Sequence, residues 1–322
     1  MFSEDMTTQI PAHEGHIALG TMYFGTRQNR EQSFAILDRF VELGGRWLDT
    51  ADNYAFWQHD SGLGGQSERM LGSWLAARPG ARDQVWISTK AGADPLEPHR
   101  WPETMEGLSR AALDRAIAGS LERLGTDRVE LYWAHVEDRS VPLDELVSSL
   151  GAIVADGRVG QLGASNHPAW RVERARAIAH AHGLAPFSAV QLRHTFLQPI
   201  PFAPLPDGGH VVATPEALDF VSSERLALWA YNTLLSGAYA NSDRLQEPYR
   251  HEGTTRRLDA LDQVARRHAA SRTQVVLAWL LGGSPAVTPI VGVSSVAQLD
   301  EVMAARELVL DESDRAVLNS SA

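Results

Sequence analysis

Short apolar segments alternate with longer amphipathic segments along the whole chain, and this alternation strongly limits the folds that it can adopt. Strands that alternate with helical patterns are typical of a parallel sheet covered by helices. Residues 24–30, after the first strand segment, lack the glycine fingerprint expected of an open doubly wound sheet. The pattern therefore predicts a closed (β/α)8 barrel of eight parallel strands. The predicted strands are Ala18–Tyr23, Arg46–Asp49, Val85–Thr89, Val129–His135, Gly160–Ala164, Ala189–Leu192, Leu226–Ala230 and Thr288–Val291.

The segments between these strands carry apolar residues at helical spacing. No low-complexity linker divides the 322 residues, so we expect one barrel domain over residues 1–322. The predicted helices are Glu31–Leu43, Ser67–Ala77, Leu108–Leu124, Leu143–Asp156, Ala169–His182, Thr214–Ser222, Arg256–His268, Thr273–Leu281 and Val296–Ala305.

Three long segments without helical periodicity each follow a predicted strand: Ala91–Gly107, Arg193–Ala213 and Ser236–Gly253. In a (β/α)8 barrel such loops lie at the carboxyl ends of the strands, where active sites are found. The glycine-rich segment Gly62–Ser67 lacks the Lys-Ser/Thr ending of a phosphate-binding loop, so we interpret it as a flexible connection.

Composition restricts the classes of partner. The chain has no cysteine, which excludes disulfides and thiolate metal sites. Its 29 basic and 40 acidic side chains give a net charge of −11 without a basic stripe, so nucleic acid is not an expected partner. Residues 1–15 contain no apolar run typical of a signal peptide, and no segment has the length of a membrane span, so we expect a cytoplasmic protein without a membrane partner. The oligomeric state stays open.

Four ionisable residues occur at the ends of successive predicted strands: Asp49, Tyr54, Lys90 and His135. Each has a structural explanation, since Asp49 could cap a helix, Tyr54 and His135 could lie in the core and Lys90 could be solvated. A barrel brings the four together at one opening, however, and this coincidence favours a catalytic site.

This group of residues suits hydride transfer coupled to proton transfer, because reducing a carbonyl places negative charge on an oxygen that must receive a proton. A phenol such as Tyr54 can donate that proton if a neighbouring cation, here Lys90, favours the phenolate. We expect Asp49 to pair with Lys90, and His135 to orient the substrate oxygen.

The chain resembles an aldo-keto reductase, and the matching motifs keep their order from about Leu19 to Ala304. They are the segments Leu48–Tyr54, Ser88–Lys90, Arg128–His135, Gly160–Asn166, Val190–Gln191, Trp229–Asn232 and Ile290–Leu299. The resemblance implies a catalytic tetrad of Asp49, Tyr54, Lys90 and His135, and a bound nicotinamide nucleotide. It implies contacts of Ser165, Asn166 and Gln191 with the carboxamide, and of the Tyr231 ring with the nicotinamide.

Further contacts implied by the resemblance are those of Asn232 to Leu234 with the pyrophosphate and of Gly292 to Gln298 with the adenosine. Ser165 or Asn166 could instead be a helix cap, and Tyr231 a core aromatic residue. The expected cofactor-binding residues are Thr21, Met22, Asp49, Ser165, Asn166, Gln191, Tyr231, Asn232, Leu234, Gly237, Gly292, Ser294 and Gln298, and the expected substrate-pocket residues are Tyr23, Trp57 and Trp101.

The adenosine segment departs from the pattern of the family. Residues 290–302 contain no lysine or arginine to pair with a 2′-phosphate, and Val302 stands where an asparagine is usual. Some branches of the family have Ser and Gln in this segment, as this chain has at Ser294 and Gln298, and they resemble NADP binders. The resemblance therefore favours NADP as the cofactor and leaves NAD open.

These observations predict an enzyme that reduces an aldehyde or ketone, which could be flat or sugar-like, or that runs the reverse oxidation. The alternative is a slow nicotinamide-binding sensor or regulatory subunit of the same fold. No metal site is expected, because His180 and His182 lie two residues apart and point away from each other on a helix.

Overall fold

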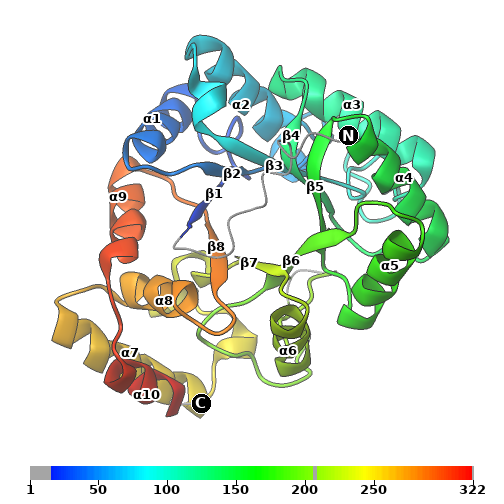
Figure 1. Cartoon of the computed structure of the whole chain (residues 1–322). Helices are drawn as coiled ribbons and strands as arrows, with labels where there is room; N and C mark the ends of the chain where they lie inside the picture. Colours follow the sequence, from blue (N-terminus) through cyan, green and yellow to red (C-terminus); the bar gives the residue numbers. More distant parts are fainter. Residues whose placement is uncertain (1–15, 206–208, 321–322) are drawn as a thin grey trace, which may run out of the picture.

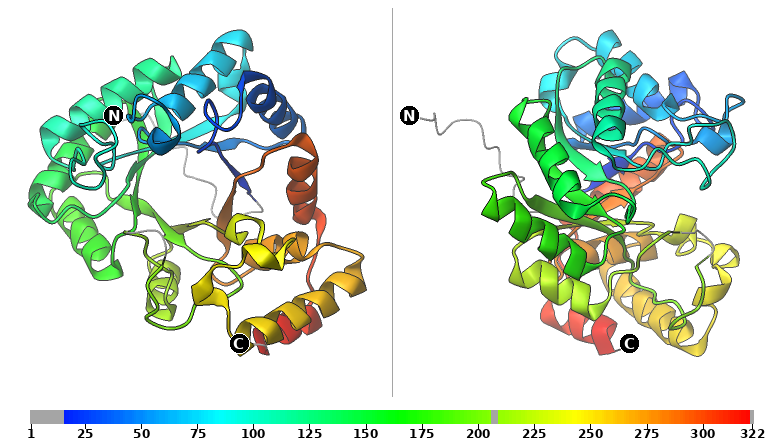
Figure 2. Two further views of the ribbon diagram at one scale, coloured as in Figure 1. Left: turned by 180° about the vertical axis from the view of Figure 1, so that it is seen from behind. Right: turned by 90° about the vertical axis from the view of Figure 1, so that its right-hand side faces the viewer.

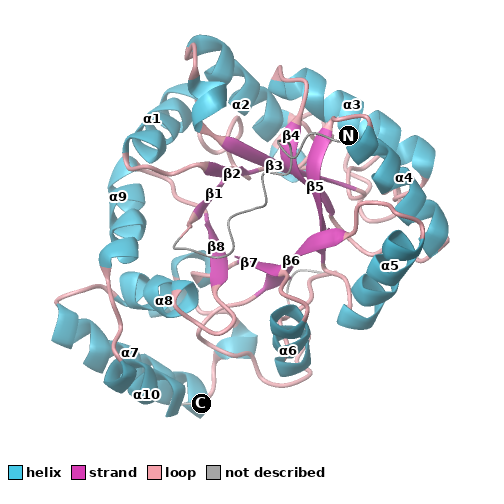
Figure 3. Ribbon diagram, in the orientation of Figure 1, coloured by secondary structure: helices cyan, strands magenta, loops and turns pink. Residues whose placement is uncertain are grey.

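The fold is that of a computed structural model, in which residues 16–205 and 209–320 are described. Each strand pairs in parallel with the next, and β8 pairs with β1, so that the strands close into one barrel. Figures 1 and 3 show this central ring surrounded by helices. The predicted (β/α)8 barrel is confirmed. Its strands are β1 (Ala18–Gly20), β2 (Trp47–Asp49), β3 (Trp86–Ala91), β4 (Val129–Ala134), β5 (Val159–Ser165), β6 (Phe187–Arg193), β7 (Ala227–Tyr231) and β8 (Val287–Val291).

Helices enclose the barrel on all sides, as the views in Figure 2 also show. Several begin at residues suited to capping: Asn29 and Ser271 each form a capping box, in which the side chains at both ends of the first turn bond to backbone amides. The helices are α1 (Arg30–Glu42), α2 (Gln66–Ala77), α3 (Arg110–Leu124), α4 (Leu143–Ala155), α5 (Ala169–Ala181), α6 (Pro215–Ser223), α7 (Glu252–His268), α8 (Arg272–Leu281), α9 (Val296–Ala304) and α10 (Glu312–Ser320).

Most element bounds shift by one or two residues, and three elements differ more from the prediction. β1 ends at Gly20 because the chain turns at Thr21, whose carbonyl accepts the Phe24 amide at 2.9 Å. α7 begins at Glu252, before the predicted start, and α10 was not predicted. α10 packs on α7, where the buried carboxylate of Asp314 binds both Arg267 and His268.

A layer of tryptophan rings fills the barrel below the carboxyl ends of its strands. The ring centroid of Trp229 lies 5.0 Å from that of Trp47 and 5.6 Å from that of Trp133. Gly163 is required beside this layer, because a Cβ atom there would lie 2.2 Å from the Trp133 ring. Since side chains alternate along a strand, residues two positions further on form the next layer up. They are Asp49, His135 and Tyr231.

No helix in the described part of the chain combines the length and apolar character needed to cross a bilayer. The expectation that residues 1–15 hold no signal segment lies outside the described residues.

Candidate active site

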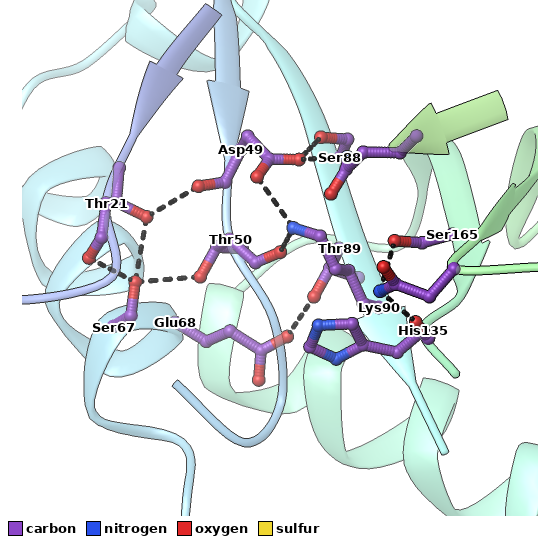
Figure 4. A network of polar contacts seen from close by, with 12 residues as sticks. Thr21, Asp49, Thr50, Ser67, Glu68, Ser88, Thr89, Lys90, His135 and Ser165 are labelled. Carbon is purple, nitrogen blue, oxygen red and sulfur yellow. Dashed lines mark hydrogen bonds and ion pairs between the residues drawn. The ribbon is translucent and has the colours of Figure 1, made fainter. Parts of the chain in front are cut away.

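The four predicted catalytic residues come together above the tryptophan layer. Asp49 ends β2, Lys90 lies near the end of β3, His135 follows β4, and Tyr54 lies in the turn after β2. The ammonium nitrogen of Lys90 is 4.6 Å from the centroid of the Tyr54 ring, and the Tyr54 and His135 ring centroids are 6.0 Å apart. Figure 4 shows three of the four residues, Asp49, Lys90 and His135. The barrel therefore groups these residues as the sequence predicted.

Asp49 and Lys90 form the expected ion pair, and it is fully buried. Lys90 Nζ donates to Asp49 Oδ2 at 2.6 Å and to the carbonyl of Thr50 at 2.7 Å. Burial lowers the pKa of Lys90, and the Asp49 carboxylate opposes that change. The charge of Lys90 is thus held by two acceptors on β2 and the turn that follows it.

Tyr54 keeps its proton. Burial, and then the Asp49 carboxylate, raise the pKa of this phenol well above its ordinary value. Asp49 and Thr50 engage the ammonium group of Lys90, and its expected effect on the Tyr54 phenolate stays a prediction. Tyr54 remains partly accessible in the turn after β2.

His135 is a neutral imidazole. Burial, and then the charge of Lys90, lower the pKa of His135 well below its ordinary value. Its Nδ1 atom is buried and makes no hydrogen bond within the described part of the chain. A neutral ring carries one N–H and one acceptor nitrogen, so His135 can bind a substrate oxygen without bringing a charge.

The amide side chains expected to hold a carboxamide lie at the ends of β5 and β6. Asn166 Nδ2 donates to the His135 carbonyl and to Ser165 Oγ, both at 3.1 Å. Asn166 Oδ1 accepts from the Val211 amide at 3.1 Å and from the Tyr231 hydroxyl at 2.7 Å. All of the hydrogen-bonding positions of Asn166 are therefore engaged, and a bound carboxamide would replace one of these bonds.

Two other residues expected to contact the cofactor also form hydrogen bonds within the protein. Gln191 Nε2 lies 3.4 Å from Asp49 Oδ1. Thr21 is fully buried, and its hydroxyl bonds to the Asp49 carbonyl and to Ser67 Oγ. Thr21 therefore supports the end of β2, whereas its neighbour Met22 is partly exposed.

The residues expected to contact the pyrophosphate and the adenosine of the nucleotide lie in two loops. Asn232, Leu234 and Gly237 belong to the turn after β7, where Asn232 and Gly237 have φ values of 54° and 88°. Gly292, Ser294 and Gln298 lie exposed after β8, and Gln298 Oε1 accepts from the Ser294 amide at 2.8 Å. Val302 is buried in the core.

Arg244 was missed by the sequence analysis. Its Nη1 atom donates to the carbonyl of Ser236 at 3.3 Å and would lie 3.1 Å from a Cβ atom at Gly237. The side chain is exposed, so it places a cation beside the turn after β7. The spacing of Arg244 from β7 gives no signal in the sequence, because the loop between them has no regular period.

The three expected pocket residues gather around a short 3₁₀ turn, Phe56–Gln58. The Phe56 ring contacts both Trp57 and Trp101, at centroid distances of 5.0 and 6.4 Å. The Tyr23 ring is linked to the same turn through Arg27, which lies 4.3 Å above it and bonds to Gln58. Trp57 is 42% exposed, so an aromatic surface lies open beside Tyr54 in the chain.

A cluster of carboxyl groups lies behind Tyr54 and Lys90. Burial, and then Glu106, raise the pKa of Asp52 well above its ordinary value, and the same two causes raise the pKa of Asp94 to about 7. Glu68 also belongs to the cluster and pairs with Arg123 at 2.7 Å. The cluster therefore holds protons at a pH where exposed carboxyl groups have lost them.

This cluster makes folding stability depend on pH. The folded-state pKa of Asp94 exceeds the unfolded value, so the folded chain binds the extra proton between about pH 4 and 7, and stability is lost as the pH rises through that window. We expect Asp94→Asn, which keeps the acceptor for the Gly64 amide, to raise the free energy of unfolding at pH 8 by about 2 kcal/mol, after an allowance for solvent screening. At pH 5 the change should be small. Urea unfolding at both pH values measures this effect.

Asp138→Asn is the matched control, because hydrogen bonds from Ser140 and Leu108 lower the pKa of Asp138 against the opposing effect of burial. That variant should be less stable than the wild type at pH 8. An Asp94→Asn variant that is destabilised at pH 8 would contradict the proton-holding cluster.

No group of three or more potential ligands for a metal ion occurs in residues 16–205 and 209–320. The described polar groups at the strand ends are instead a phenol, an imidazole, an ammonium–carboxylate pair and amides. Together, the closed barrel and this site define a barrel enzyme of the oxidoreductase class.

Comparison with known proteins agrees with this class. The model of the aldo/keto reductase family matches residues 16–322, and the chain belongs to that family. It is 30% identical to norsolorinic acid reductase A of Aspergillus parasiticus, over 92% of this chain and 75% of the relative. It is 31% identical to an aryl-alcohol dehydrogenase of Pestalotiopsis microspora, over 88% and 71%, and 28% identical to the uncharacterized oxidoreductase YrpG of Bacillus subtilis, over 94% and 90%.

Proposed function

We propose that this protein reduces an aldehyde or ketone with NADP(H), and that Tyr54 is the proton donor. The neutral Tyr54 phenol next to Lys90 and His135 is the observation that carries the proposal. A sensor with the same fold would not need this arrangement of an acid, a cation and an imidazole at one opening.

Each residue of the site has a separate role in the proposed reaction. NADPH, when bound, supplies the hydride. His135 orients the carbonyl oxygen, and Tyr54 donates its O–H proton to that oxygen as charge develops there. Lys90, fixed by Asp49, offsets the charge left on the Tyr54 oxygen. The tryptophan layer beneath the site excludes water from below.

The nucleotide fits the residues available to it. Ser165, Asn166 and Gln191 would hold the carboxamide, with Tyr231 against the ring, and the turns at residues 232–237 and 292–298 would hold the rest. A Cβ atom at Gly292 would meet nothing within 4 Å, which leaves space for a ligand. Arg244, beside the turn after β7, would bring a positive charge to the pyrophosphate.

We propose a flat aromatic carbonyl compound as the substrate class. The exposed ring of Trp57, the neighbouring Trp101 and the Tyr23 ring offer apolar faces for stacking. Two of the relatives are named for norsolorinic acid and for aryl alcohols. The preference is tested by comparing kcat/KM for an aryl aldehyde and an aldose, and a higher value for the aldose would contradict it.

Nucleotide binding is the first test of the proposal. We expect NADPH and NADH to quench the fluorescence of the nine tryptophans, and Arg244→Leu to raise the Kd of both by about tenfold, as expected for losing a charge-assisted contact. Arg115→Leu, an exposed change on α3, should leave both Kd values unchanged. Failure of both nucleotides to bind the wild type would overturn the proposed function. An effect of Arg244→Leu on NADPH alone would place the guanidinium at the 2′-phosphate instead of the pyrophosphate.

A further inference from the structure

Ser88 binds the carboxylate of the buried ion pair from the side opposite Lys90. Its hydroxyl donates to Asp49 Oδ1 at 2.7 Å, and Lys90 Nζ donates to Asp49 Oδ2 at 2.6 Å (Figure 4). Ser88 and Asp49 are partners in the register of β2 and β3, and both are buried. The two oxygens of Asp49 are therefore assigned to two different donors on the same strand.

The next residue along β3 has a different partner. Thr89 points away from Asp49, and its hydroxyl donates to Glu68 on α2 at 2.6 Å. Because side chains alternate along a strand, Ser88 and Lys90 share the inner face, and Thr89 lies on the outer one. β3 thus carries two similar hydroxyl–carboxylate bonds, and one of them lies in the site.

Ser88 makes the shortest bond to Asp49 Oδ1. The amide of Gln191 reaches this oxygen at 3.4 Å, and the Tyr54 phenol also forms a hydrogen bond with the Asp49 carboxylate. A buried carboxylate oxygen that loses its short bond must find another donor. Without Ser88, the carboxylate would turn toward Lys90 or draw Gln191 closer, and either movement disturbs a neighbour of Tyr54 or of the expected carboxamide site.

The geometry points to Ser88 as a positioning residue for the reaction: it fixes the rotation of the Asp49 carboxylate and so holds Lys90 against the Tyr54 ring and leaves Gln191 available to the cofactor. This inference rests on the proposed carbonyl reduction. Ser88 acts through Asp49, to which its hydroxyl donates.

Ser88→Ala tests the inference, with Thr89→Val as the matched control on the same strand. We expect Ser88→Ala to lower kcat about 10- to 100-fold, as is usual when an orienting hydrogen bond is lost, with a smaller change in KM. The solvent deuterium isotope effect on kcat should rise, because proton transfer from Tyr54 becomes slower. Thr89→Val should lower the thermal unfolding temperature to a similar extent and keep the wild-type kcat and isotope effect.

A second pair of variants covers the case in which Ser88→Ala does not fold. Ser88→Thr and Ser88→Val have nearly the same shape and differ in the hydroxyl, so Thr should retain most of the kcat that Val loses. Wild-type kcat and isotope effect in Ser88→Ala, or in Ser88→Val where Ser88→Ala does not fold, would overturn the inference. Equal losses in Ser88→Ala and Thr89→Val, or in Ser88→Thr and Ser88→Val, would do the same. Failure of the wild type to reduce any carbonyl compound while it binds NADPH would instead overturn the proposed function on which the inference rests.

Discussion

Replacing Tyr54 with phenylalanine is expected to lower kcat for carbonyl reduction by about a thousandfold, the range usual for loss of a general acid. The ring that Lys90 approaches at 4.6 Å is retained, so the change removes the proton and little of the packing. Nucleotide binding should survive, because Tyr54 is not among the residues expected to hold the cofactor. Single-turnover oxidation of bound NADPH, followed by absorbance, separates the two effects.

Tyr132→Phe is the control for this result. Tyr132 lies on β4, and its hydroxyl is buried without a hydrogen-bond partner in the described part of the chain, so removing it should leave kcat unchanged. Wild-type turnover in the Tyr54→Phe variant would remove Tyr54 from the proposed mechanism.

Lys90→Met is expected to abolish turnover and also to destabilise the fold. The Asp49 carboxylate would remain buried without its cation, and breaking a buried pair in this way reduces the free energy of unfolding by roughly 3 to 5 kcal/mol. Urea unfolding measures this loss independently of activity.

A double variant separates the two roles of Lys90. Asp49→Asn combined with Lys90→Met removes the uncompensated charge and retains an acceptor for Ser88, so stability should recover in large part while activity stays lost. Recovery of activity in the double variant would show that the charge of Lys90 is not needed. A Lys90→Met variant as stable as the wild type would show that the pair does not support the fold.

The sequence was sufficient for the barrel and for the grouping of the tetrad. Asp49, Lys90 and His135 are placed by strand ends, and a closed parallel barrel brings successive strand ends together whatever the details of packing. The ion pair between Asp49 and Lys90 could be predicted for the same reason.

The upward shift of the pKa of Tyr54 could not be predicted, because it depends on how deeply the phenol is buried and on its position relative to the Asp49 carboxylate. The carboxyl cluster of Asp52, Glu68, Asp94 and Glu106 is equally a result of loop packing, since its members come from four separate segments. Ser88 is different. It stands two residues before Lys90 on a strand, so the alternation of side chains already placed both on one face, and only the position of its acceptor was missing.

The tryptophan layer limits the direction from which molecules can enter the site. As far as the described residues show, Trp47, Trp133 and Trp229 close the barrel beneath Asp49 and His135, which leaves the side of the loops for approach. Because molecules can enter from this side alone, a molecule bound deep against Gln191 must enter before one bound above it at Tyr54 and Trp57. It must also leave after it. The depth of each binding position, rather than the affinity of its ligand, would then set the order in which the two molecules bind and leave.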